Sequence, residues 1–467
     1  MLRPIGFFLL SVSTAAMAAA PVDPQTAQHI DADVATILQR TGTPSATIEV
    51  TEHGQVVYRK AYGLSDREKR TPATVDTYYE IGSITKQFTA AAMLQLQEAG
   101  KLRLDDKLSV YLPQAPHADE LTLRQLLEQV SGLPDYLDAM DAAGTDTKPA
   151  SFDQLISYVA GKPLEFTPGS KWEYSNTNYI LAGRVIEVVS HESYQHYVQT
   201  HLLEPAGMTH TFTVADEKRL PGMAIGYTSE KGRVDRARTF DATVGWSAGF
   251  LVSTVADLEK WDEALRGGRI VRPADYTLMS TSAKTTGGED TGYGLALFVD
   301  SLDDQPRVGH TGGSLGFTSA NEYFPKQDVQ VIAFTNLRSD PEPGERVTNA
   351  VFSDLYPALA EAAERPAAGE DPKVTAMAQG VFAGLQSGTE DSADLTPHLA
   401  GKLQGLSQHF VEQFGPYGQP TQFIYKGKRS AGGFTYYDYL IQFGPGSEFK
   451  LGVGLDASGK VGSLSFG

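Results

Sequence analysis

The chain has 467 residues, 41% of them hydrophobic and 21% charged, which is the composition of a globular protein with room for one large domain and a smaller one. Its formal net charge of −18 argues against a nucleic-acid partner, because phosphate binding needs a basic face. The sequence contains no cysteine, which excludes disulfide bonds and cysteine chemistry.

Residues 1–20 have the pattern of a secretory signal peptide. Arg3 supplies a positive charge at the start, residues 5–10 form an apolar segment, and residues 16–18 (Ala-Met-Ala) make an A-x-A cleavage site. The apolar segment is short for a membrane-spanning helix, so an uncleaved anchor is the weaker alternative. We expect a periplasmic or secreted protein, cleaved after Ala18 or two residues later, with no transmembrane anchor after cleavage.

Helical and strand patterns follow one another in an order that predicts one sheet built from both ends of a domain. Asp23-Pro24 predicts a helix start, with an N-cap followed by proline at the first position. A polar and helical middle portion runs from about 101 to 265, and a final helix is expected over about 345–363. We therefore expect an antiparallel sheet flanked by helices, with a helical subdomain beside it. The expected strands cover residues 46–50, 56–62, 295–299, 319–324 and 329–335.

A small unit is expected after the last of these helices. Residues 364–372 have the composition of a linker, and a helix at about 397–414 then precedes several alternating strands. This order of elements is that of a small α+β domain, with an NTF2-like or cystatin-like fold as our suggestion. The chain is thus divided into a signal peptide, a hydrolase domain, a linker and an accessory domain. They cover residues 1–20, 21–363, 364–372 and 373–467.

One short motif indicates the chemistry. Ser83 and Lys86 belong to a Ser-Ile-Thr-Lys segment at the start of a long helix that ends near Gly100, and residues three apart on a helix share a face. A neutral lysine amine at that spacing can take the proton of a serine hydroxyl, which alone is a poor nucleophile. The alternative is a helix N-cap serine beside a solvated lysine. A second Ser-x-x-Lys, at residues 447–450, has no catalytic motif near it.

Two further motifs follow in the chain, Tyr174 to Asn176 (Tyr-Ser-Asn) and His310 to Gly313 (His-Thr-Gly-Gly). In this order the three motifs resemble those of the serine β-lactamase and penicillin-binding-protein superfamily. The tyrosine version is similar to the branch of class C β-lactamases, DD-peptidases, D-aminopeptidases and β-lactamase-like esterases. The resemblance covers roughly residues 25–360. It rests on the order of the motifs, because an ordered set is more specific than each motif alone. Other matching stretches are residues 131–134, 168–169, 247–251 and 293–295.

This resemblance implies an α+β fold of the β-lactamase/transpeptidase type and a serine hydrolase that works through an acyl-enzyme. Ser83 would be the acylated nucleophile, with Lys86 and Tyr174 carrying protons. The substrate would be a small molecule or peptide with an acyl bond, no cofactor or metal is implied, and the oligomeric state stays open. Substrate-binding and oxyanion roles would fall on Asn176, His310, Gly312 and Gly313.

The histidine at position 310 is a departure that bears on the substrate. Many β-lactamases carry lysine there, a permanent cation that faces the substrate carboxylate, whereas histidine is mostly neutral at pH 7. We therefore expect action on D-amino-acid peptides or amides, of the peptidase or carboxypeptidase type. A carboxylesterase or β-lactamase of the same fold is the alternative, and a catalytically silent binder of peptidoglycan fragments is a second one.

Residues 245–249 (Gly-Trp-Ser-Ala-Gly) match the G-x-S-x-G nucleophile elbow and offer Ser247 as a rival nucleophile. The elbow needs a buried strand before it, and residues 238–243 make a poor one. We therefore expect a turn that lines the cleft, with Trp246 as a wall against the substrate.

Overall fold

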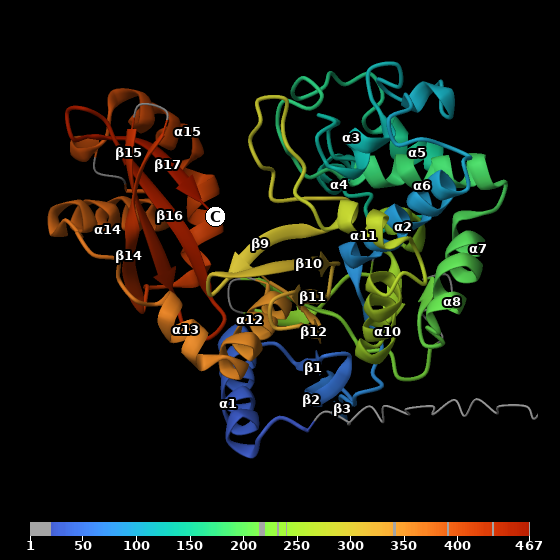
Figure 1. Ribbon diagram of the computed structural model, residues 1–467, viewed down its shortest axis with the longest axis horizontal. Helices are drawn as coiled ribbons and strands as arrows, with labels where there is room; N and C mark the ends of the chain where they lie inside the picture. The colour runs from blue at the N-terminus through green and yellow to red at the C-terminus, as the bar shows by residue number, and fades with distance from the viewer. Residues whose placement is uncertain are drawn as a thin grey trace, which may run out of the picture.

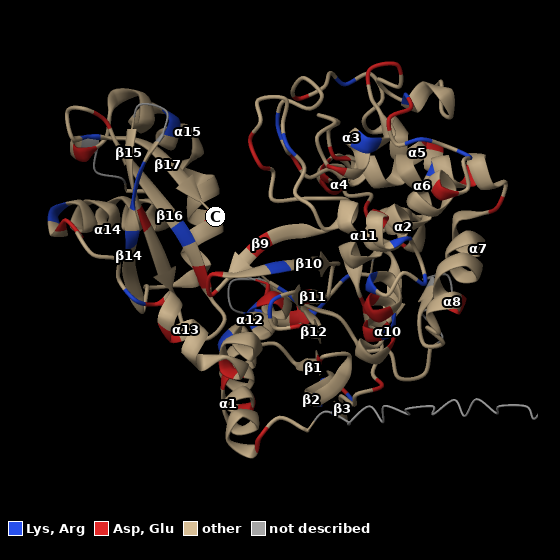
Figure 2. Cartoon of the chain, viewed as in Figure 1, with Lys and Arg blue, Asp and Glu red and all other residues tan. Residues whose placement is uncertain are grey.

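The computed structural model describes residues 20–213, 220–230, 233–239, 241–339, 342–389, 392–431 and 434–466. The expected signal peptide lies outside these ranges except for Ala20. Figure 1 shows a central sheet with a helical part at upper right and the C-terminal part, in orange and red, at left. Acidic and basic residues are spread over all three regions (Figure 2). No helix within the described ranges is long and apolar enough to cross a membrane.

A seven-stranded antiparallel sheet forms the centre, in the order β3-β2-β1-β12-β11-β10-β9. β1 and β12 join the strands from the two ends of the domain, with Ala46 opposite Thr335 and Glu52 opposite Val329. The expectation of one sheet built from both ends is confirmed. The strands are β1 (Ser45–Glu52), β2 (Gln55–Asp66), β3 (Thr71–Pro72), β9 (Phe298–Leu302), β10 (Gln305–Gly313), β11 (Thr318–Phe324) and β12 (Val329–Thr335).

Helices cover both faces of this sheet. α1 (Pro24–Thr41) and α12 (Pro343–Leu355) pack side by side on one face (Figure 1) and bury a hydrophobic cluster there. Asp23 accepts hydrogen bonds from the first backbone N–H groups of α1, as the predicted N-cap should. The helix expected over 345–363 is two helices, α12 and α13 (Pro357–Ala363). The break falls at Pro357, which lacks the N–H that would continue α12.

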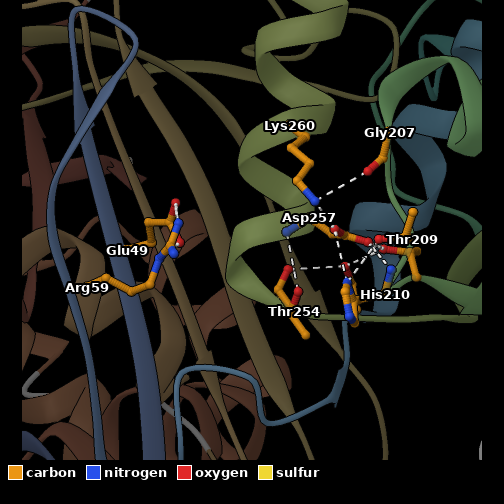
Figure 3. Close-up of polar contacts among 10 residues, drawn as sticks. Glu49, Arg59, Gly207, Thr209, His210, Thr254, Asp257 and Lys260 are labelled. Carbon is orange, nitrogen blue, oxygen red and sulfur yellow. Dashed lines mark hydrogen bonds and ion pairs between the residues drawn. The ribbon is translucent and has the colours of Figure 1, made fainter. Parts of the chain in front are cut away.

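Buried charges hold α10 (Val255–Arg266), which packs on the other face against β1 and β12. Asp257 accepts a hydrogen bond from the His210 N–H at 2.5 Å, and Lys260 Nζ lies 2.8 Å from its other oxygen (Figure 3). On β1 the buried Glu49 is paired with Arg59 at 2.5 and 2.8 Å. The contacts of the buried Asp257 therefore tie α10 to the segment around His210, whereas the Glu49–Arg59 pair joins the neighbouring strands β1 and β2.

The helical part is built around α2 (Thr85–Glu98), most of whose residues are buried. α6 (Asn176–Ser190) and α9 (Ala242–Gly249) pack against α2. The other helices are α3 (Leu123–Leu127), α4 (Tyr136–Ala142), α5 (Phe152–Ser157), α7 (Tyr194–Val198), α8 (Glu204–Ala206) and α11 (Pro273–Met279). Two small sheets have the orders β4-β8-β5 and β13-β6-β7. Their strands are β4 (Tyr79–Glu80), β5 (Phe212–Thr213), β6 (Tyr227–Glu230), β7 (Arg233–Arg236), β8 (Leu251–Ser253) and β13 (Leu337–Arg338).

The C-terminal part is a four-stranded antiparallel meander packed with two helices around its own hydrophobic cluster. α15 (Pro397–Phe414) has the bounds expected from the sequence, and β17 (Val461–Phe466) is the last of the expected strands. α14 (Pro372–Ser387) was not expected, because we counted its first residue as the end of the linker. The independence of this part as a domain stays a prediction. The other strands are β14 (Gln422–Ala431), β15 (Phe434–Gln442) and β16 (Glu448–Leu455).

Candidate active site

Ser83 and Lys86 face each other where a short 3-10 turn, η1 (Gly82–Ile84), leads into α2. The distance between Ser83 Oγ and Lys86 Nζ is 3.0 Å. Thr85 accepts a hydrogen bond from the backbone N–H of Leu251 at 3.0 Å. Thr89 donates one to the backbone carbonyl of Ser247, in α9, at 2.7 Å. The structure therefore brings together the pair that the first motif predicts and holds it on a fixed helix end.

The Lys86 amine is fully buried and has two further neighbours. It donates to the side-chain oxygen of Asn176 at 2.7 Å and to the carbonyl of Ala248 at 2.6 Å. Burial lowers the pKa of Lys86 to about 7, although the negative charge of Asp135 acts in the opposite direction. A neutral amine has two N–H groups for these two oxygens and a lone pair for the Ser83 hydroxyl.

Asp135 orients Asn176 and was not predicted from the sequence. One oxygen of Asp135 accepts hydrogen bonds from the Asn176 backbone N–H at 3.0 Å and from its side-chain amide at 2.7 Å. The amide nitrogen is thus engaged, so the amide oxygen points at Lys86. Asp135 is also the N-cap of α4. Its position directly after the matching stretch 131–134, before a helix, is a signal that could have identified it.

Tyr174 lies on the other side of the lysine. Lys86 Nζ is 4.8 Å from the centre of the Tyr174 ring. The tyrosine hydroxyl is buried and has no hydrogen-bond partner at bonding distance. Burial raises the pKa of Tyr174 well above its usual value, whereas interaction with the Ser83 hydroxyl lowers it. The tyrosine is therefore protonated and close to the serine oxygen.

The last four residues of β10 lie beside the nucleophile. The edge strand of the sheet is β9, which pairs with β10 only as far as Gly309. Beyond that point β10 is unpaired on the site-facing side. A methyl group on Gly312 would come 2.0 Å from the Ile81 carbonyl oxygen, and one on Gly82 would come 2.7 Å from the Gly313 nitrogen. The glycines therefore allow the backbone of β10 to approach the nucleophile segment.

His310 is buried and hydrogen-bonded on both ring nitrogens. Its Nδ1 lies 2.5 Å from the Thr311 carbonyl oxygen and its Nε2 lies 3.0 Å from the Tyr293 hydroxyl. Because a carbonyl can only accept, Nδ1 carries the hydrogen and Nε2 accepts from the tyrosine. Burial and, to a smaller extent, the charge of Lys86 lower the pKa of His310 to about 3. This histidine is therefore neutral at pH 7.

The Gly-Trp-Ser-Ala-Gly segment has a supporting role in the structure. The Ser247 hydroxyl is buried and donates to the Tyr179 carbonyl at 2.9 Å, so Ser247 is not placed as a nucleophile. Trp246 packs against Tyr194 and Phe152 and does not belong to the residues that line the pocket. The structure thus places it elsewhere than the wall that we expected. What the segment supplies is the carbonyl that holds Lys86.

A pocket of about 590 Å³ opens over this group of residues. The aromatic rings of Trp172 and Phe298 line it, with their centres 6.3 Å apart, and Tyr293 packs against both from behind. The volume suits a small molecule or a short peptide. The predicted site residues among its lining are Ser83, Tyr174, Asn176, His310 and Gly313.

Carboxylates also line the pocket. Asp138, Asp141 and Asp146 all belong to its lining. Asp146 is paired with Arg238 at 3.2 Å, and Asp141 lies 4.0 Å from the same guanidinium. Asp138 has no ion pair with any residue that the structure describes. This wall attracts a positive group.

Arg338 is the basic side chain in the lining that the sequence did not reveal. Its guanidinium lies over Gly313, where a methyl group would come 2.0 Å from it. Glu342 pairs with it and also lines the pocket. The pair leaves the pocket with an excess of negative charge.

The chain belongs to the Beta-lactamase family, whose model matches residues 28–355. Protein flp of Staphylococcus aureus is 30% identical over 325 residues, which are 68% of this chain and 64% of that protein. A D-stereospecific amidohydrolase from Streptomyces sp. is 26% identical, with a TM-score of 0.60 over 72% of this chain and 99% of that one. The protein is therefore a serine hydrolase of the β-lactamase fold.

The likeness extends beyond the family match in one solved structure. The octameric penicillin-binding protein homologue from Pyrococcus abyssi has a TM-score of 0.64 and 23% identity, and it covers 92% of this chain and 96% of its own. This share is larger than the family match, so the fold of the C-terminal part is included in the likeness.

We expect Gly312→Ala to destabilise the protein and lower its activity. The added methyl group meets the backbone oxygen of Ile81, so β10 must move away from Ser83, at a cost of about 1–3 kcal/mol. Thermal unfolding and ester hydrolysis measure both effects. The control is Gly287→Ala, whose methyl group meets nothing closer than 3.5 Å. Equal melting temperatures for the two variants would contradict the close approach.

Proposed function

We propose that this protein hydrolyses amides and short peptides of D-amino acids that carry a free amino group, through an acyl-enzyme on Ser83. The observation that carries the proposal is the charge of the pocket. Asp138, which has no ion pair among the described residues, can receive an ammonium group, and Asp141 lies in the same lining beside Arg238, while neutral His310 offers no cation to a substrate carboxylate. The likeness to a D-stereospecific amidohydrolase supports the stereochemistry.

The reaction begins with attack of Ser83 Oγ on the amide carbonyl. The hydroxyl proton passes to the neutral Lys86 amine at 3.0 Å as the new C–O bond forms. The backbone N–H groups of Ser83 and Gly313 face the oxyanion, a type of contact worth about 2.7–4 kcal/mol per donor. The C–N bond then breaks, and the leaving amine takes the proton from Lys86 through the Tyr174 hydroxyl.

Water releases the acyl group by the reverse sequence. It attacks the ester carbonyl and gives one proton to the Tyr174 and Lys86 pair. The bond from carbon to Ser83 Oγ breaks, and the serine oxygen takes that proton back. The products are a free carboxylic acid and the original hydroxyl, so no oxidant, metal or cofactor enters the balance.

A substrate panel tests this assignment. D-alanine amide and D-alanyl peptides with a free amino group should be hydrolysed with higher kcat/KM than their N-acetylated forms, because acetylation removes the charge that the aspartates attract. An ester and a β-lactam serve as comparisons. Preference for the acetylated amides would contradict the proposed recognition of a free amino group. Turnover of the ester alone would instead support the carboxylesterase alternative. Absence of turnover and labelling would favour a silent binder.

Replacement of the nucleophile should abolish covalent chemistry. Ser83→Ala should remove labelling by a fluorophosphonate and lower turnover on the order of 10³-fold or more, as loss of a nucleophile does in triad enzymes. Ser247→Ala is the matched control and should keep its label. Intact-protein mass spectrometry reads both results, and a label retained by the Ser83 variant would refute the assignment.

The pH dependence should report the buried lysine. Acylation needs neutral Lys86, so kcat/KM should rise with pH through about 7, the pKa of Lys86. Asp135 raises that pKa, so Asp135→Asn should lower it and move the rise to lower pH. Measuring kcat/KM against pH for the wild type and for the folded Asp135→Asn variant tests this expectation. A shift to higher pH would contradict the charge argument.

Export is part of the proposal, supported by the charge, apolar segment and A-x-A site in residues 1–20. Expression in a bacterial host should yield a periplasmic or secreted protein that begins near residue 19 or 21. Cell fractionation and N-terminal sequencing check this. An intact N-terminus on cytoplasmic protein would argue against it.

A further inference from the structure

A second cavity lies at the junction of the main domain and the C-terminal part. It has a volume of about 500 Å³ and is lined by α12, by α15 and by the turn that joins β15 to β16. The two parts meet closely there, since a methyl group on Gly446 of the turn would come 1.8 Å from the Arg346 carbonyl oxygen.

Arg346 of α12 brings an unpaired charge to this cavity. The residue is only 8% exposed, and its Nε has no hydrogen-bond partner. Within the described ranges no carboxylate forms an ion pair with its guanidinium. Burial and, to a smaller extent, the nearby charge of Arg40 lower the pKa of Arg346 to about 10. A buried cation without a partner lowers the stability of the folded protein, so an anion bound to Arg346 would stabilise it.

Ser447 offers a second unpartnered group in the same lining. It is 4% exposed, and its hydroxyl has no hydrogen-bond partner. It belongs to the Ser-x-x-Lys copy that the catalytic site does not use. Lys450 instead donates to Ser301 Oγ at 3.1 Å across the junction. The Ser447 hydroxyl therefore lacks a partner within the protein, in the same cavity lining as Arg346.

The remaining charges in the lining are negative and engaged with other residues. Glu345 lies 3.5 Å from Arg307, and Glu412 accepts a hydrogen bond from Gln408 at 2.6 Å. Glu448 likewise accepts from a glutamine at 3.3 Å. A lone anion would relieve Arg346 but would be repelled by these carboxylates. A molecule with one negative and one positive group satisfies both.

We propose that this cavity binds a free α-amino acid, with its carboxylate on Arg346 and Ser447 and its ammonium group toward the surrounding glutamates. Carboxylate and guanidinium form short, charge-assisted hydrogen bonds, which supply the missing partner of the buried arginine. The cavity is large enough for a side chain as well. The site does not depend on the activity proposed above, because its residues lie outside the Ser83 group.

The test is binding of DL-alanine to the full chain by calorimetry and by thermal shift at millimolar concentration. Propionate lacks the ammonium group and ethylamine lacks the carboxylate, so each removes one half of the recognition. The variants are Arg346→Met, Ser447→Ala and the control Arg269→Met, an exposed arginine of another surface. Hydrolysis of a nitrophenyl ester shows that each variant keeps an intact catalytic site.

Alanine should bind the wild type and the Arg269 variant and raise their melting temperatures, with propionate and ethylamine at least tenfold weaker. Arg346→Met should lose this binding, and its ligand-free melting temperature should be equal or higher, because an unpaired buried charge has gone. Ser447→Ala should weaken binding about tenfold, the equivalent of 1.4 kcal/mol.

Three results would overturn the proposal. The first is no binding of alanine to the wild type, and the second is propionate bound as tightly as alanine. The third is unchanged binding in both Arg346→Met and Ser447→Ala, which would place the amino acid in the Ser83 pocket. If Arg346→Met unfolds, the Ser447 variant alone decides.

Discussion

Burial of the Lys86 amine is the constraint on which the rest of the site depends. An ammonium group in this position would lose its hydration, so the protein favours the neutral amine near pH 7. The neutral amine is the form that can accept a proton from Ser83. The same burial requires oxygens for its two N–H groups, and Asn176 and the Ala248 carbonyl supply them. α2, α6 and α9 must therefore meet at one point.

The same constraint accounts for the histidine beside it. A lysine at position 310 would place a permanent ammonium group close to Lys86, and its repulsion would disfavour the protonated state through which Lys86 passes during acylation. His310 avoids this conflict, because both of its nitrogens are used in hydrogen bonds and it stays neutral. Arg338 is then the cation in the pocket lining, and it is paired with Glu342. The aspartates therefore give the pocket its net negative charge.

Much of the fold followed from local patterns. The Asp-Pro start of α1, the strand pattern of β12 and the helical stretch of α15 gave bounds close to those observed, because each rests on neighbours in the sequence. The same Asp-Pro signal at Asp371 was assigned to a linker, and α14 was missed. The break at Pro357 was also missed, since helical periodicity continues across it.

The site residues that belong to sequence motifs were predicted. Those that come from distant segments and meet only in the folded structure were missed. Ser83 and Lys86 are one turn apart, so their contact follows from helix geometry. Asp135 reaches Asn176 from a different segment, and Trp246 turns toward Tyr194 rather than the pocket. Such placements depend on packing between distant segments, which spacing alone does not encode.

The most direct test of this account is the pKa of Lys86 itself. Protein labelled with ¹³C at the lysine ε carbon can be titrated by NMR, with the Lys86 signal assigned by its absence in Lys86→Met. A midpoint near 7 is predicted, with the signal of neutral amine above it. A midpoint near the unperturbed value of about 10.4 would show that the buried amine stays charged, and Lys86 would then not be the base for Ser83.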